Sequence, residues 1–468
     1  MNTEEKKQKF LATFAITGLI VVLTIIVGFS VSNFSNIVRV SISPSDTSAA
    51  TSTPTTTKNT FHLAVIPAFI PTFNSTGAYI NVFDTLTNRI VRQFTVNQKP
   101  DYVAMSQDGR YAYLAQARPN SLTPNTSLIY KLDLQSLSIS NTLGIPTPAP
   151  HQIYDLEISP DGKWLGVLDI QLGTIHLVNT QTLTIVRTVV LCPTCSGSTT
   201  GGTWDQDLLV FSPDSRYLYV AKRGQATVVV LDISNFTTIS TFPSLGYPFY
   251  TLRDMKLSPD QRYLYVLANG FDLSHPSTIR RYDLTNSGNF QDFYPPPSMS
   301  DGRVTTVGDM EIIQVANGTS YLVTQGNTVY APGFIDALNL NTLQWIRIPS
   351  LASGNSFFTY NKSTHDLYST CETSPIPTST NCIPSRVSMV NMDTLSETAV
   401  IDIPGFPLGF SFKFPSFSQD GRYYYQPMDS NNVVVIDATS KTVTGSINTG
   451  LPPRGVYMQG DSSPKEFY

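Results

Sequence analysis

One short phrase recurs along the chain and constrains the fold more than any other feature. Its clearest copy is Ser212-Pro213-Asp214-Ser215-Arg216-Tyr217, followed by a Leu-Tyr-Val-Ala run. Proline presets φ at the second position of a turn, and the aspartate side chain bonds the backbone two residues on. The run after the turn alternates and is rich in β-forming residues. The phrase therefore predicts a strand, a tight turn and a second strand.

Further copies of this turn occur at other places in the chain. They begin at Ser106, Ser159, Ser258 and Ser418. Two weaker turns, at 316–320 and 361–365, supply turn-forming residues at corresponding places. Recurrence about every 50 residues is typical of β-units that stack into one repeat architecture.

Each repeat can be read as four strands, which we call A to D. The turn lies between A and B, B is the Tyr-containing run, C ends at Asp or Asn, and D follows a short polar turn. Strand C is expected eight times, at Ala78–Asp84, Leu128–Asp133, Thr174–Asn179, Thr227–Asp232, Thr278–Asp283, Gly333–Asn339, Arg386–Asn391 and Asn432–Asp437. The count predicts an all-β propeller with eight four-stranded blades. Seven blades are the alternative, because the middle repeats are weak.

The two ends of the repeat region complement each other. Residues Phe61–Ile66 read as a strand B with no strand A before it, and Arg454–Gln459 read as a strand A with no strand B after it. Pairing of these strands would close the ring and remove open sheet edges, which invite aggregation. We therefore expect one closed propeller over residues 61–468.

Two of the strand B phrases carry a family resemblance. Tyr219-Val220-Ala221-Lys222 and Tyr265-Val266-Leu267-Ala268-Asn269, each after a Ser-Pro-Asp-x-Arg turn, resemble the YVTN-type β-propeller repeat. That repeat is similar to those of lactonase-like and surface-layer-type propellers. The resemblance covers nearly all of residues 61–468 and implies the fold, whereas propellers host many unrelated activities. No stretch matches a lactonase active site, so the resemblance assigns no catalytic residue.

The first sixty residues do not carry the repeat. Lysines at 6, 7 and 9 precede an uncharged apolar run over 10–31, which is long enough to cross a bilayer as a helix. The positive-inside rule places residues 1–9 in the cytoplasm and the rest of this single-pass protein outside the cell membrane. A cleaved signal peptide is the alternative, although its apolar region is usually about 7–15 residues. Residues 32–60 are rich in Ser, Thr and Pro, as in an extended stalk that can carry O-glycans.

Acidic residues gather where strand A is expected to begin, near the central channel. Asp155 and Asp254 stand four residues before the motif serine, a second carboxylate follows two residues later in two repeats, and Asp101 and Asp207 fall one residue earlier. The full set is Asp101, Asp155, Glu157, Asp207, Asp254, Asp309 and Glu311. A hard cation such as Ca²⁺ binds six to eight oxygen ligands, so the set is a candidate divalent-metal site at one channel mouth. The alternative is that these residues are solvated or pair with Lys256, Arg253 and Arg454.

The catalytic signals are weak. His151 precedes Asp155 by four residues and could act as a base at the same mouth, but no motif places a Ser or Cys partner beside it. A nucleophile elbow, a His-Glu-x-x-His sequence and a phosphate-binding glycine loop are all missing from the sequence. We expect a plain loop histidine.

Cysteine and asparagine residues suggest an extracellular setting. Three pairings of Cys192, Cys195, Cys371 and Cys382 are possible, and we favour the local one, 192–195 with 371–382, over zinc or redox roles. Acceptor sequences for N-glycans occur at Asn33, Asn74, Asn125, Asn235, Asn317 and Asn361. Most of these asparagines fall in expected loops, where a glycan would not disturb a blade.

Charge argues against one class of function, and loop length indicates where function lies. The formal net charge is −4, and only 14% of residues are charged, which argues against a nucleic-acid partner. Function in propellers concentrates in loops, and the extended ones here are Phe69–Ala78, Arg118–Ser127, Leu191–Thr203, Asp292–Arg303 and Cys371–Ser385. The favoured hypothesis is a binding module for a cell-surface protein or an envelope glycan. A metal-dependent lactonase-type hydrolase and a structural envelope component are the alternatives.

Overall fold

The structure is a computed structural model that describes most of the chain after residue 61. The described residues are 62–69, 77–97, 99–116, 126–146, 153–169, 174–191, 208–222, 227–243, 251–269, 277–286, 288–296, 307–326, 334–350, 358–370, 386–403, 414–428 and 430–459. The predicted membrane helix and stalk lie outside them. Within these ranges, no helix is long and apolar enough to cross a membrane.

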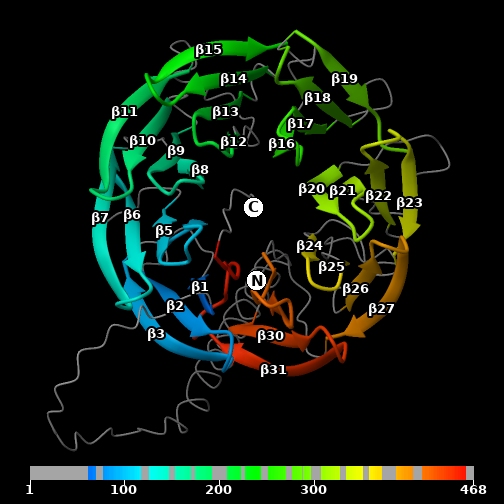
Figure 1. The fold of residues 1–468 in the computed structure, drawn as a ribbon. Helices are drawn as coiled ribbons and strands as arrows, with labels where there is room; N and C mark the ends of the chain where they lie inside the picture. Colours follow the sequence, from blue (N-terminus) through cyan, green and yellow to red (C-terminus); the bar gives the residue numbers. More distant parts are fainter. Residues whose placement is uncertain are drawn as a thin grey trace, which may run out of the picture. The chain divides into compact units, whose positions relative to one another are not determined.

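Eight antiparallel sheets form a closed ring around a central axis (Figure 1). Blades 1 to 4 contain β1 (Leu63–Ala68), β2 (Ala78–Asp84), β3 (Arg89–Val96); β4 (Tyr102–Met105), β5 (Tyr111–Ala115), β6 (Thr126–Asp133), β7 (Ser138–Pro146); β8 (Ile153–Ile158), β9 (Trp164–Asp169), β10 (Thr174–Asn179), β11 (Thr184–Val190); and β12 (Leu208–Phe211), β13 (Tyr217–Lys222), β14 (Thr227–Asp232), β15 (Thr237–Phe242). Blades 5 to 8 contain β16 (Thr251–Leu257), β17 (Tyr263–Asn269), β18 (Thr278–Asp283), β19 (Phe290–Phe293); β20 (Val307–Gln314), β21 (Ser320–Gly326), β22 (Phe334–Asn339), β23 (Trp345–Pro349); β24 (Phe358–Asn361), β25 (Asp366–Thr370), β26 (Arg386–Asn391), β27 (Ser396–Asp402); and β28 (Ser416–Phe417), β29 (Tyr423–Pro427), β30 (Asn432–Asp437), β31 (Thr442–Asn448). The prediction of eight blades, rather than seven, is confirmed.

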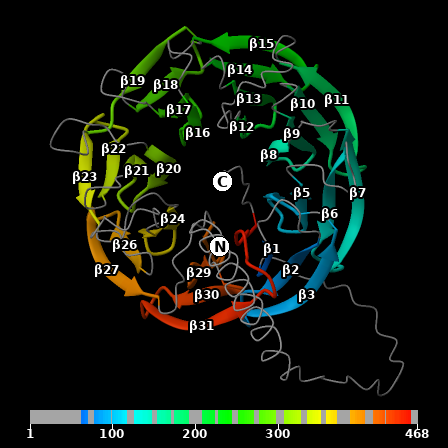
Figure 2. The same cartoon turned by 180° about the vertical axis from the view of Figure 1, so that it is seen from behind.

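The ring closes as the sequence predicts. Val65 of β1 and Tyr457 exchange both backbone hydrogen bonds, at 2.9 and 3.0 Å. A second bridge joins Ala68 to Pro453, so residues 453–457 supply the innermost strand that blade 1 lacks. Figure 2 shows this C-terminal segment beside β1, at the centre of the ring.

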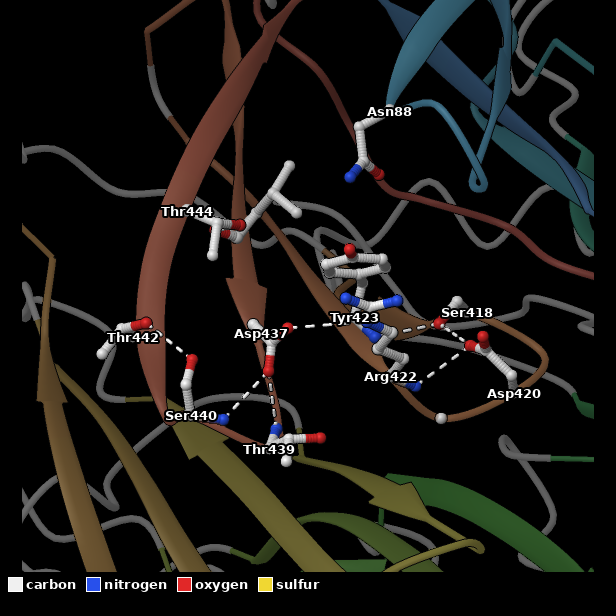
Figure 3. Close-up of polar contacts among 12 residues, drawn as sticks. Asn88, Ser418, Asp420, Arg422, Tyr423, Asp437, Thr439, Ser440, Thr442 and Thr444 are labelled. Carbon is white, nitrogen blue, oxygen red and sulfur yellow. Dashed lines mark hydrogen bonds and ion pairs between the residues drawn. The ribbon is translucent and has the colours of Figure 1, made fainter.

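The repeated phrase forms one turn with the same contacts in five blades. In blade 4 the Ser212 hydroxyl accepts the Tyr217 amide at 2.8 Å, while the Asp214 carboxylate accepts the Arg216 amide at 3.0 Å. Ser215, between Asp214 and Arg216, has φ of 60°, as does Gln261 in blade 5, whereas the other three copies have a glycine at this position. Figure 3 shows the copy in blade 8, with Ser418 and Asp420 side by side.

The basic residue of the phrase reaches the end of strand C in the same blade. In blade 8, Arg422 lies 3.6 Å from Asp437, and blades 2, 4 and 5 have the same pair at 3.3 to 3.5 Å. Blade 3 has Lys163 in place of arginine and no carboxylate at the end of strand C, so Lys163 pairs with Asp161 at 2.9 Å instead. These exposed pairs each contribute at most about 1 kcal/mol.

The core is divided among the interfaces between neighbouring blades. Between blades 4 and 5, for example, Phe242 stacks on the buried Tyr282 with ring centroids 4.9 Å apart. The Tyr282 hydroxyl donates to the Pro243 carbonyl at 2.8 Å, so this side chain satisfies its polar atom across the interface. Each interface of this kind fixes one blade against the next, which positions the innermost strands.

The two ends of the ring differ. At one end, which we call the turn end, A–B turns span four or five residues and C–D turns four to six. At the other, the loop end, the longest connections follow β25 and β11 and span fifteen and seventeen residues. The described chain starts and finishes at the turn end, since the His62 carbonyl accepts the Thr85 amide of a C–D turn, and Gln459 bonds Gln107 and Gln419 of two A–B turns.

Candidate functional site

The predicted acidic residues of blades 3, 5 and 6 lie on the innermost strands, with the aspartates within the strand and Glu157 and Glu311 two residues closer to the turn end. Asp101 lies just before β4, at the loop end. Leu156, Met255 and Met310 pair with Val167, Val266 and Thr324, which each occupy the fourth position of strand B counted from its Tyr or Trp. The preceding residues, Asp155, Asp254 and Asp309, are therefore equivalent positions of blades 3, 5 and 6, as predicted. A β-bulge lies at this level in each of the three strands.

Asp155 is a buried link between two blades. Its side chain has no exposed surface. One carboxylate oxygen accepts the amide of Leu156 at 2.5 Å, and the other accepts the amide of Leu209 in β12 of the next blade at 2.8 Å. Both backbone amides are thereby paired at the interface between the two blades. Loss of the carboxylate would leave these buried amides without an acceptor, which costs free energy of folding.

Asp254 repeats this link two blades further on. Its carboxylate accepts the amides of Met255 at 2.8 Å and of Met310 in blade 6 at 3.2 Å. Leu209 and Met310 hold the same register position in blades 4 and 6. Two of the aspartates predicted to form a metal-binding ring, Asp155 and Asp254, thus act as inter-blade hydrogen-bond acceptors.

Burial dominates the protonation behaviour of Asp155. Desolvation, followed by the nearby Glu157 carboxylate, raises the pKa of Asp155 well above its ordinary value. The two amide hydrogen bonds act in the opposite direction, because they stabilise the charged form. The net effect favours a protonated carboxyl over a wider pH range than a solvated aspartate has.

The accessible groups of the channel wall stand two residues after the aspartates. They are Glu157, Lys256 and Glu311, all partly exposed. Lys256 Nζ lies 3.4 Å from a Glu311 oxygen and 3.7 Å from an Asp254 oxygen. The predicted pairing of these acids with Lys256 is therefore found, and it balances one of the negative charges on this wall.

A metal site is not found in this part of the structure. Among the described residues, no group of three or more His, Cys, Asp or Glu side chains could hold a metal ion. Both oxygens of Asp155 already accept amides, and Asp254 lies beside a lysine. Asp207 and the side chain of Asp309 lie outside the described part of the chain.

A second charged cluster, which the sequence analysis missed, lies at the seam where the ring closes. Lys99 Nζ is 5.7 Å from the ring centroid of Phe69, and Arg454 Cζ is 5.1 Å from the same centroid. Desolvation lowers the pKa of Lys99, Asp101 opposes this effect, and Arg454 adds to it. Only closure of the ring brings these distant segments together, so no local sequence signal could have found the cluster.

The remaining predicted sites have mixed outcomes. His151, the four cysteines, Asn33, Asn74 and Asn125 lie outside the described residues, so their roles remain predictions. Asn235 and Asn317 are exposed. Asn361, in contrast, is 1% exposed and donates its amide to the Gly421 carbonyl at 2.7 Å. The expectation of a glycan at Asn361 is corrected, because the folded blade buries the acceptor nitrogen.

Comparison with known proteins identifies the fold and not a family. No family model matches the chain, and no curated protein matches it. The structure is similar to the dihydro-heme d1 dehydrogenase NirN in complex with DHE, with a TM-score of 0.64 and 17% identity over 88% of this chain and 78% of that one. It is also similar to apo AztD from Citrobacter koseri, with a TM-score of 0.54 and 11% identity over 84% of this chain and 97% of that one. At such identities the likeness establishes a shared β-propeller fold.

Proposed function

We propose that this protein is a membrane-anchored β-propeller of the YVTN-repeat type that binds a cell-surface protein or an envelope glycan outside the cell. The binding surface is the loop end of the ring. The apolar run over 10–31 is the anchor, and residues 32–60 are the stalk.

The difference between the two ends carries this proposal. Short turns with internal hydrogen bonds form the turn end, whereas the long connections all leave from the loop end. Variable loops on a rigid scaffold are the usual place for recognition. The described chain enters the propeller at the turn end through His62, which is the end opposite the long connections.

One solved structure of similar fold contains a bound ligand. NirN, a protein of similar fold, was solved in complex with DHE. The nature of the ligand here has to come from this chain's own residues.

Topology can be tested in intact cells with single-cysteine variants in a chain whose native cysteines are changed to serine. We expect Gln181→Cys, at an exposed turn, to react with a membrane-impermeant maleimide without cell lysis. Thr3→Cys should react only after lysis. Labelling of Thr3→Cys in intact cells, or of neither before lysis, would overturn the proposed orientation.

Binding can be tested with the full-length protein in nanodiscs on arrays of envelope glycans and surface proteins. We expect capture that Lys99→Gln and Tyr294→Ala at the loop end alter and that Lys163→Gln at the turn end does not. Capture that changes only with Lys163→Gln would place the binding surface at the turn end and contradict the proposal. Metal-dependent lactone hydrolysis, or ordered sheets of purified protein, would instead favour the hydrolase or the structural alternative.

A further inference from the structure

The outermost strand of each blade lies on the circumference of the ring, which we call the rim. Within the described chain, each of these strands pairs with one neighbour and is therefore the edge of its sheet. The free side of an edge strand can pair with another strand, and proteins commonly prevent this with charged residues, proline or glycine. Five outer strands, β3, β11, β19, β23 and β27, contain a charged residue, and β7 and β31 contain a glycine. The outer strand β15 of blade 4 contains none of these residue types.

The residues of β15 favour pairing with a further strand. Its sequence, Thr-Thr-Ile-Ser-Thr-Phe, is rich in β-branched residues, and Ile239 is 51% exposed. Short uncharged segments of this kind readily add to other strands. A β-bulge at Ile239 interrupts the pairing with β14, but the same irregularity occurs in β3, β7, β11, β27 and β31. The bulge is thus a general feature of these blades and does not distinguish β15.

The neighbouring outer strands add apolar surface to this part of the rim. Val186 and Val190 of β11 are 47% and 54% exposed, and Phe290 of β19 is 47% exposed. The strands β11, β15 and β19 follow one another along the rim (Figure 1). With Ile239, these three strands carry half of the eight exposed large apolar side chains of the described chain. Exposed apolar side chains that gather in one region indicate an interaction surface.

We propose that β15 pairs antiparallel with β15 of a second copy of this chain, which joins two propellers rim to rim. In such a twofold pairing, every residue of the strand faces a residue of the same strand. A self-paired β3 would bring Arg89 and Arg92 close to the same arginines, whereas β15 brings no like charges together. Threonines that face each other across strands are a favourable pair, and the backbone hydrogen bonds supply the affinity.

The symmetry of this pairing suits two copies in one membrane. Figure 1, which looks along the axis of the ring, shows β15 running along the rim with its free side outward. Antiparallel pairing of identical strands requires a twofold axis perpendicular to the sheet. That axis is parallel to the axis of the ring, so the turn ends of both copies point the same way. This step rests on the proposed membrane anchor, which would also raise the local concentration of the copies.

The first test measures the mass of the full-length protein in detergent micelles by light scattering over a range of concentrations. We expect the parent protein to reach twice its mass of 51.5 kDa. Thr241→Lys puts a charge on the exposed edge and should raise the dissociation constant of the dimer at least about tenfold. Thr142→Lys, at an exposed position of the outer strand β7, is the matched control and should leave it unchanged. Melting temperatures should show that both variants are folded.

The second test cross-links single-cysteine variants in liposomes with a short bis-maleimide, after the native cysteines are changed to serine. Ile239→Cys should link two copies, whereas Val91→Cys, 43% exposed on β3, should not. A monomer at every concentration, a dimer that Thr241→Lys leaves intact, or equal cross-linking of the two cysteine variants would overturn the pairing. Capture of a ligand on the arrays should persist in Thr241→Lys, so failure of the pairing and failure of the proposed function are separate results.

Discussion

The carboxylate of Asp155 in blade 3 accepts the backbone amide of Leu209 in blade 4 at 2.8 Å, across a seam that excludes water. Asp254 makes the same link from blade 5 to Met310 in blade 6 at 3.2 Å. In both cases the acceptor position follows a β-bulge that turns the side chain toward the next blade. Two aspartates that suggest a ligand site in the sequence therefore hold neighbouring blades together.

Replacement of Asp155 should destabilise the propeller. Asp155→Ala leaves two buried amides without an acceptor, and we expect a loss of about 3 kcal/mol in the free energy of unfolding. Asp155→Asn keeps one acceptor oxygen and should cost about half as much. Urea denaturation, monitored by circular dichroism, measures both changes.

Asp402→Asn provides the control for this prediction. Its side chain is 74% exposed and pairs with Arg386 at the surface, so we expect a change below about 0.5 kcal/mol. Equal effects of Asp155→Ala and Asp402→Asn would show that the inter-blade link contributes nothing specific.

The turn aspartates should make stability depend on acid pH. The Ser212 hydroxyl, aided by the amide and charge of Arg216, lowers the pKa of Asp214 below its ordinary 3.8. The folded state thus favours the ionised carboxylate, and this stabilisation is complete above the unfolded pKa and lost as pH falls through the folded pKa. We expect Asp214→Asn to be less stable than the parent protein at pH 7, and the gap to close as pH falls below about 3.8. Denaturation midpoints between pH 7 and pH 2.5 provide the measurement, and a gap that stays constant would contradict the assignment.

Closure of the ring should depend on Tyr457. This residue is 2% exposed, and its backbone pairs with Val65. Tyr457→Ala should cost about 3 to 5 kcal/mol, as for other large aromatic side chains removed from a core. Hydrogen exchange should quicken first in β1, because that strand loses its innermost neighbour. Tyr294→Ala is the control, since that ring is 53% exposed, and comparable losses in the two variants would argue against a special role for closure.

Asn361 should behave as a structural residue. Its amide donates to the Gly421 carbonyl at 2.7 Å, and its oxygen accepts the Ser363 amide at 2.9 Å, so blade 7 is tied to blade 8. Asn361→Ala should cost about 1 to 3 kcal/mol in thermal or urea unfolding, whereas Asn235→Ala at an exposed turn should cost less. In a host that attaches N-glycans, mass spectrometry of the folded protein should find Asn361 unmodified. A glycan on every copy of Asn361 in the folded protein would contradict the conclusion that this side chain is buried.

The fold was predictable because its signals are local. The Ser-x-Asp turn specifies its own hydrogen bonds between Ser212, Asp214 and Tyr217, and the same pattern is written five times in the sequence. Strand C ends at an Asp or Asn whose side chain accepts turn amides, as Asp437 does from Thr439 and Ser440 at 2.9 Å each. Counting such ends gives the number of blades without knowledge of any long-range contact.

The site was predictable only in part, because its contacts are not local. Spacing from the motif serine placed Asp155, Asp254 and Asp309 at one level of the ring, and the strand registers agree. Spacing could not show that an amide of the following blade would meet each described carboxylate. The cluster of Lys99 and Arg454 could not be predicted either, because these residues are hundreds of positions apart and only closure of the ring brings them together.

His62 and Gln459 both lie at the turn end, where their hydrogen bonds fix them to neighbouring turns. A sensor surface, fluorescent reporter or affinity resin coupled through either point would leave the opposite mouth unobstructed. The same geometry suits circular permutation, because a short linker between the two points would keep blade 1 intact while new termini open elsewhere. The propeller can therefore be attached at the turn end while engineered recognition loops are displayed at the loop end.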